Sequence, residues 1–224
     1  MKFQLLSIFP DIFSSYLNES ILKRAQDKQA AEFKIHNLRD WTADKHKTVD
    51  DAPYGGGAGM LMKIEPLYKA LEDIKKLNKK IDPKKRKILF MSAGGKKWTQ
   101  TLAQKYAKLD ELILICGRYE GADARLKKFI DEEISVGDYV LTGGELPALT
   151  IIDSIVRLLP GVLGNSQSIV EESHSELGTL EYPQYTRPEV FIAKGKKYPV
   201  PKVLLSGDHK KIKEWQQGKT KKIK

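Results

Sequence analysis

The amino-acid sequence predicts an α/β domain with a mostly parallel sheet, followed by a small, mainly helical C-terminal domain. Short runs of continuous apolar residues alternate with segments of helical length, which is typical of strands buried on both faces. Near residue 165 the core-forming residues give way to a polar stretch and then to a lysine-rich one. We therefore expect an α/β domain at 1–164, a flexible linker at 165–181 and a basic domain at 182–224.

The elements follow from periodicity and from turn residues. Strands are expected at 3–9, 32–38, 88–91, 112–116 and 134–141, and helices at 20–30, 65–80, 98–109, 125–130 and 146–159. In the basic domain, residues 203–215 read as a short strand and then a helix capped near Asp208.

The expected helix at 146–159 is apolar on nearly every side, so we expect it to be buried in a core or against another subunit. Asp153 and Arg157 interrupt its apolar surface four residues apart. Two interpretations remain open at this point: the two charges pair with each other, or Arg157 faces a functional site.

Charge is unevenly distributed along the chain, whose formal net charge is +10. The segment 75–97 holds ten Lys and Arg against one Asp, and 194–224 holds eleven Lys against two acidic residues. Between them, 110–149 carries nine acidic and four basic residues. Two basic tracts of this kind favour a nucleic-acid partner, because neutralising phosphates releases counterions; the alternative is that the lysines only keep the chain solvated.

Several classes of protein are disfavoured by the composition. No apolar run reaches the roughly 18 residues of a membrane span, and the first residues have no signal-peptide pattern. The single cysteine, Cys116, forms no disulfide framework and fits a reducing cytoplasm. The four histidines are scattered, so we expect no structural zinc site and assign no metal ligand.

Three glycine-bearing loops follow expected strands, at 92–95, 117–121 and 142–145. Ligands of parallel sheets bind beyond the carboxyl ends of the strands. We therefore predict a pocket that closes around a small ligand through backbone contacts. A further loop, at 49–60, has four glycines within five positions and two preceding acids, which makes it a second candidate for close ligand approach.

Five strings occur in order: VDDAPYGGGAGM (49–60), CGRYEGAD (116–123), SVGDYVLTGGELPALTIIDSIVRLLPGVLG (135–164), YPQYTRPEV (182–190) and VLLSGDHKKIKEW (203–215). Their sequence and spacing resemble the bacterial tRNA (guanine-N1)-methyltransferases of the TrmD family, in the knotted SPOUT superfamily. The resemblance covers nearly the whole chain.

The resemblance implies a deep trefoil knot at the carboxyl strand ends and S-adenosylmethionine bound inside it. The matching cofactor-binding positions are Ser92, Gly117, Tyr119, Glu120, Gly121, Val136, Gly137, Asp138, Tyr139, Val140, Leu141, Gly143 and Gly144. Ser92-Ala93-Gly94 replaces a Ser-Pro of the family, which is expected to adjust the contacts to adenine. The resemblance also implies a homodimer with its active site at the interface, and dependence on magnesium.

The implied reaction is methylation of guanine N1 immediately 3′ of the anticodon, with the anticodon stem-loop of tRNA as partner. Arg157 matches the family's catalytic arginine. The family's base is an Asp followed by Ser, and here the string is Glu172-Ser173-His174, so Glu172 is the first candidate. Glu171, Glu181 and a neutral His174 remain open as the base.

Two other functions remain open for this sequence. One is a related SPOUT RNA methyltransferase with another target nucleotide. The other is a catalytically inactive RNA-binding homologue. The only feature that favours it is Glu172, which stands where the family has an Asp. A phosphate-binding α/β hydrolase built on the glycine-rich loop at 49–60 is a third interpretation, but the chain has no catalytic motif for it.

Overall fold

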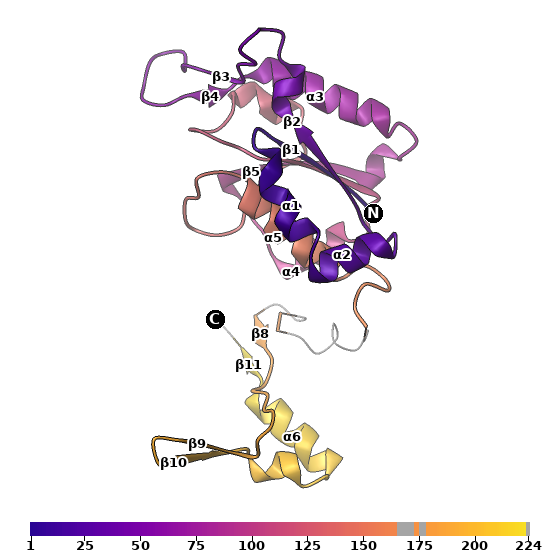
Figure 1. Cartoon of the computed structure of the whole chain (residues 1–224), viewed down its shortest axis with the longest axis vertical. Helices are drawn as coiled ribbons and strands as arrows, with labels where there is room; N and C mark the ends of the chain where they lie inside the picture. The colour runs from indigo at the N-terminus through magenta and orange to yellow at the C-terminus, as the bar shows by residue number, and fades with distance from the viewer. Residues whose placement is uncertain (165–172, 175–177, 223–224) are drawn as a thin grey trace. The chain divides into compact units, whose positions relative to one another are not determined.

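The computed structural model describes residues 1–164, 173–174 and 178–222. It divides into two compact units, Met1–Gly164 and Asn165–Lys224. Figure 1 shows the chain coloured by residue number.

The first unit is built on a five-stranded sheet in the order β2-β1-β6-β5-β7, in which every neighbouring pair is parallel. This arrangement is the α/β fold with a mostly parallel sheet that the alternation predicted. The strands are β1 (Lys2–Ser7), β2 (Glu32–Asn37), β5 (Arg86–Lys97), β6 (Glu111–Ile115) and β7 (Glu132–Ser135).

Helices cover both faces of this sheet (Figure 1). On one face lie α1 (Ser14–Leu17), α2 (Ser20–Asp27), α4 (Gln100–Tyr106) and α5 (Glu145–Val156); on the other lies α3 (Ile64–Leu77). Alternate residues of one strand serve the two cores: Phe3 and Leu5 belong to one cluster and Leu6 to the other. This is the period of two that a strand buried on both sides requires.

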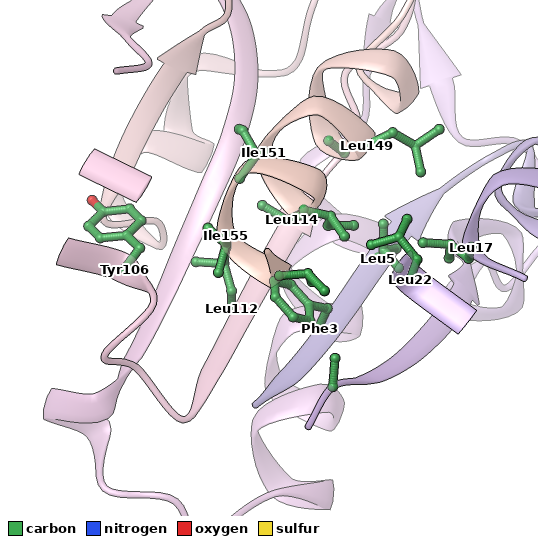
Figure 2. Close-up of a cluster of buried hydrophobic side chains, with 14 of the residues drawn as sticks. Phe3, Leu5, Leu17, Leu22, Tyr106, Leu112, Leu114, Leu149, Ile151 and Ile155 are labelled. Carbon is green, nitrogen blue, oxygen red and sulfur yellow. The ribbon is translucent and has the colours of Figure 1, made fainter. Parts of the chain in front are cut away.

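The larger core lies between the sheet and α5. Figure 2 shows Leu149, Ile151 and Ile155 of α5 over Phe3 and Leu114 of the strands, all of them buried. Eight of the twelve residues of α5 are buried by their own chain. The apolar character of this helix is thus mostly explained by the core of one subunit.

The short elements of this unit are η1 (Pro10–Phe13), η2 (Leu38–Trp41), β3 (Asp50–Asp51), β4 (Leu61–Met62), η3 (Pro83–Lys85) and η4 (Ala124–Lys128). The helix expected at 125–130 is therefore a single 3₁₀ segment, begun by Asp123, whose side chain accepts a hydrogen bond from the backbone of Arg125. The helix expected at 98–109 begins later, at Gln100, because the Thr99 side chain caps it by accepting from Leu102 N.

Two strand predictions were wrong in extent. The strand expected at 134–141 ends at Ser135, whose hydroxyl forms a tight turn with the backbone of Gly137. The strand expected at 88–91 instead continues to Lys97 as β5, with a shift of register against β7 between Met91 and Lys96. Gly95 permits this shift, since a Cβ there would lie 2.5 Å from the backbone of Glu133.

The second unit contains α6 (His209–Lys219), η6 (Lys202–Leu205) and the strands β8 (Thr179–Leu180), β9 (Val190–Ala193), β10 (Lys196–Pro199) and β11 (Lys221–Lys222). Asp208 caps α6 by accepting from Lys211 N, as predicted. The short strand expected before α6 is the 3₁₀ segment η6 instead, which follows Pro201. Antiparallel pairs β9–β10 and β8–β11 make the described part of this unit mixed rather than mainly helical.

Candidate active site

A cavity of about 270 Å³ opens at the carboxyl ends of β5, β6 and β7. The three glycine-bearing loops predicted to form a pocket all line it: the shifted segment of β5 after Met91, the loop after β6, and the loop before α5. Ser135 to Thr142 supply much of the remaining wall. The apolar run after β7 that resembled a strand is thus a pocket wall, with Val140 86% exposed.

Twelve of the thirteen predicted cofactor-binding residues line this one cavity: Ser92, Gly117, Tyr119, Glu120, Gly121, Val136, Gly137, Tyr139, Val140, Leu141, Gly143 and Gly144. The exception is Asp138, which does not line the cavity. Its carboxylate is exposed and lies 2.6 Å from Nζ of Lys97. Arg118 and Thr142 also line the cavity, as part of the predicted loops, and so does Pro147, which the sequence did not mark as a site residue.

Glycine brings the loops together without side chains between them. A Cβ on Gly144 would lie 2.7 Å from Cys116 Cα and 2.7 Å from Gly117 N. Gly144 N–H also donates to the Gly117 carbonyl at 2.8 Å. The pocket wall at this point is therefore backbone against backbone, with no side chain between the two loops.

A buried ion pair fixes two of these loops. Arg118 Nη2 lies 2.9 Å from Glu145 Oε2, and Arg118 Nε donates to Glu145 Oε1 at 3.2 Å. Ser7 Oγ donates to the same Oε1 at 2.6 Å, from the end of β1. Arg118 Nη1 donates to the Thr142 carbonyl at 3.2 Å. Since Arg118 and Glu145 are far apart in the chain, sequence spacing gave no signal for their pairing.

The glycine-rich loop at 49–60 adjoins the pocket without lining it. Glu120 N donates to the Met60 carbonyl at 3.1 Å, and Met62 N donates to the Gly121 carbonyl at 2.9 Å. A Cβ on Gly59 would lie 2.4 Å from Glu120 Cγ. Burial, and then the neighbouring Asp50 carboxylate, raises the pKa of Tyr119, which lies in the loop at 117–121.

Arg157 does not line the cavity. It caps the end of α5, whereas Pro147, in the first turn of α5, lines the pocket. The twelve residues of α5 rise about 18 Å along the helix axis. The Asp153 carboxylate accepts a hydrogen bond from the Tyr16 hydroxyl.

Glu172, the first candidate for the base, and Glu171 lie outside the described residues. His174 and Glu181, which the sequence also left open as the base, are described and lie in the second unit. His174 N donates to the Thr179 carbonyl at 2.6 Å, and Glu181 N donates to the Ser173 hydroxyl at 3.0 Å.

Most basic residues of the tract at 75–97 pair with acidic residues, some from the same helix and some from distant segments. Six of its ten basic residues form ion pairs: Lys75, Lys76, Arg86, Lys87, Lys96 and Lys97. Exposed Lys79, Lys80, Lys84 and Lys85 remain, just before β5 begins. Since the pocket lies where β5 ends, these lysines are at the opposite edge of the sheet.

In residues 1–164, 173–174 and 178–222, no group of three or more His, Cys, Asp or Glu is placed to hold a metal ion. No helix in this part of the chain is long and apolar enough to cross a membrane.

The fold and the pocket define an α/β protein with a cavity at the carboxyl edge of a parallel sheet and loop backbone in its wall. The chain belongs to the tRNA (guanine-1)-methyltransferase TrmD family, whose model matches residues 1–223.

Similar proteins named tRNA (guanine-N(1)-)-methyltransferase come from several bacteria. That of Dictyoglomus turgidum is 50% identical over 217 residues, which cover 97% of this chain and 84% of the relative. That of Desulfitobacterium hafniense is 51% identical over 97% of this chain and 79% of its own length. That of Clostridium novyi is 49% identical over 98% of this chain and 86% of its own.

Proposed function

We propose that this protein transfers a methyl group from S-adenosylmethionine to N1 of the guanine immediately 3′ of the anticodon in tRNA. Membership of the family and identities near 50% over almost the whole chain make it a tRNA (guanine-N1)-methyltransferase. The observation that carries the proposed site is the gathering of twelve expected cofactor positions around one cavity.

The pocket suits S-adenosylmethionine, which when bound would supply the methyl group. Peptide groups at Gly117 and Gly144 can approach the ligand because neither residue has a side chain. Ile134, Val136 and Leu141 give the same cavity an apolar wall suited to an adenine ring. We further propose that the three loops are the site of the trefoil knot that the sequence resemblance implies.

Guanine N1 carries a proton and becomes a good nucleophile only when that proton leaves. We assign proton removal to Glu172. Negative charge then develops on O6 of the base, where a guanidinium stabilises it, and we assign this to Arg157. The target base must leave the anticodon loop to reach the pocket.

We propose that the active unit is a homodimer whose site lies at the interface, with Arg157 supplied by the partner subunit. The length of α5 supports this, because Arg157 lies ten residues after Pro147 of the pocket wall, which is about 15 Å along the helix axis. Exposed apolar residues of α5 and of the segment 9–16 are available for such an interface. They are Phe9, Ile12, Tyr16 and Leu146, each at least 39% exposed.

The second unit is the proposed holder of the anticodon stem. Residues 182–224 contain twelve Lys and Arg against three acidic residues, and phosphate contacts of this kind position RNA. The exposed lysines before β5 contribute less to this proposal, since they lie at the edge of the sheet away from the pocket. Magnesium is implied by the sequence resemblance, and we propose no residues for it.

The assignment of Arg157 and Glu172 is tested by methyl transfer to a tRNA transcript. Arg157→Ala and Glu172→Gln are expected to lose most of the transfer rate, while calorimetry still detects binding of the cofactor, because both residues are assigned to the reaction and not to the cofactor pocket. A Glu172→Gln variant that keeps the wild-type rate would remove Glu172 as the base, and Glu181→Gln would be measured next.

Sharing of the site between subunits is tested by co-expressing two inactive chains under separate tags. One carries Arg157→Ala and keeps its pocket; the other carries Gly144→Val, whose side chain fills the pocket wall. Purified heterodimers are expected to regain about half the activity of wild-type dimers, since one of the two sites is then complete. Heterodimers as inactive as their parents would show that Arg157 acts within its own chain.

A further inference from the structure

The Arg118–Glu145 ion pair is buried and lies next to the pocket. Its carboxylate is 1% exposed, and Ser7, which donates to it, is fully buried. Glu145 Oε2 faces Arg118 Nη2 at 2.9 Å, but it has no hydrogen-bond donor among the described residues. The interaction of Glu145 Oε2 with Arg118 Nη2 is therefore an attraction between opposite charges and not a hydrogen bond.

The pair lies directly behind the pocket wall. Arg118 and Gly143 both line the cavity. A Cβ on Gly143 would lie 2.2 Å from Arg118 Nε and 2.6 Å from Glu145 Oε2. Hence no side chain separates the ion pair from the wall at Gly143, and a ligand against that wall would be within range of either charge if its partner were removed.

A guanidinium at this place is a problem for the proposed cofactor. S-adenosylmethionine has a positively charged sulfonium sulfur, whereas the product S-adenosylhomocysteine has a neutral thioether. Like charges repel in the low-dielectric surroundings of a pocket. An uncompensated Arg118 would therefore disfavour the substrate relative to the product.

We propose that Glu145 neutralises Arg118 at the pocket wall and thereby sets the preference of the site for a cationic over a neutral sulfur centre. The inference rests on the proposed function, because it takes S-adenosylmethionine as the ligand. It assigns Glu145 a specificity-determining role that acts through Arg118 and requires no contact with the ligand. The start of α5 suits this role, since the helix dipole also stabilises an anion there.

Calorimetric titration of the purified protein with the two ligands, in the absence of tRNA, tests this role. Two unit charges about 10 Å apart in a medium of effective dielectric constant about 20 change an affinity roughly tenfold. Glu145→Gln, which keeps the side-chain shape, is therefore expected to lower the ratio of substrate to product affinity about tenfold. Equal weakening of both ligands would reduce Glu145 to a structural residue and overturn the proposal.

Two further variants separate charge from structure. The double variant Arg118→Gln/Glu145→Gln removes both charges. It is expected to restore the ratio of substrate to product affinity to within threefold of wild type. Arg118→Gln alone leaves the carboxylate and is expected to give a ratio at or above the wild-type value. A ratio more than threefold below wild type in the double variant, or below wild type in Arg118→Gln, contradicts the proposal, even if Glu145→Gln does not fold.

The matched control is Glu111→Gln. Glu111 is also a fully buried carboxylate paired with an arginine, Arg86, but it lies at the first residue of β6, away from the pocket. Its variant is expected to leave the affinity ratio unchanged, and a matching fall there would overturn the proposal. A wild-type protein that binds neither ligand would instead overturn the proposed cofactor, and this inference with it.

Discussion

Gly144 is the residue on which the pocket wall depends most directly. Replacing it with alanine puts a Cβ 2.7 Å from Cys116 Cα, 2.7 Å from Gly117 N and 2.8 Å from Met91 Cβ. Two of these atoms are backbone, so the neighbours cannot turn aside, and three pocket segments must move. Overpacking of this kind costs about 1–3 kcal/mol. For a chain of this size, a loss of about 2 kcal/mol lowers the melting temperature by about 4–8 °C.

Thermal unfolding followed by circular dichroism, with calorimetric titration of S-adenosylmethionine, measures both consequences of Gly144→Ala. We expect a lower melting temperature and at least tenfold weaker binding, because the wall that moves is the wall of the cavity. The control is Gly94→Ala, since Gly94 also lines the cavity but a Cβ there meets no protein atom within 4 Å. Its melting temperature is expected to stay within about 1 °C of wild type. A Gly144→Ala protein with wild-type stability and affinity would refute the proposed packing of the loops.

Two more predictions concern stability. Burial, and then the charge of Lys34, lowers the pKa of His36 to about 4. The contribution of neutral His36 to the free energy of unfolding is therefore complete above pH 6.5, and it declines by up to about 3 kcal/mol as the pH falls towards 4. His36→Gln is expected to remove close to one proton of uptake on unfolding at pH 5, and an unchanged pH dependence of urea unfolding would contradict this. Thr99→Ala is expected to cost about 1 kcal/mol, because Thr99 caps α4 through Leu102 N; Thr99→Ser should retain most of the stability, and equal losses in the two variants would argue against capping.

The features that the sequence predicted well are local ones. Apolar runs such as 112–116 predicted the strands, because a strand that is covered on both faces, such as β6, has every residue buried. The loop glycines predicted the pocket, since glycine is the residue that permits close backbone approach. Asp208 marked the start of α6 through its own hydrogen bond.

The features that the sequence could not reveal depend on contacts between distant residues. The shift of β5 against β7 requires Gly95 to meet the backbone of Glu133. Val140 has the composition of a strand residue yet is exposed at the pocket. The lysine tract looked strongly charged because its partners, such as Asp131 and Asp138, come from other segments. Hydrophobic pattern and local charge counts contain none of this information.

The most direct test of the account is the site of methylation on tRNA. Wild-type protein would be incubated with labelled S-adenosylmethionine and two transcripts that differ only in having guanine or adenine immediately 3′ of the anticodon. A methyl group on guanine N1 blocks base pairing, so primer extension should stop at that nucleotide. The account predicts label and a stop in the guanine transcript alone. Label in both transcripts, or a stop elsewhere, would contradict the proposed target.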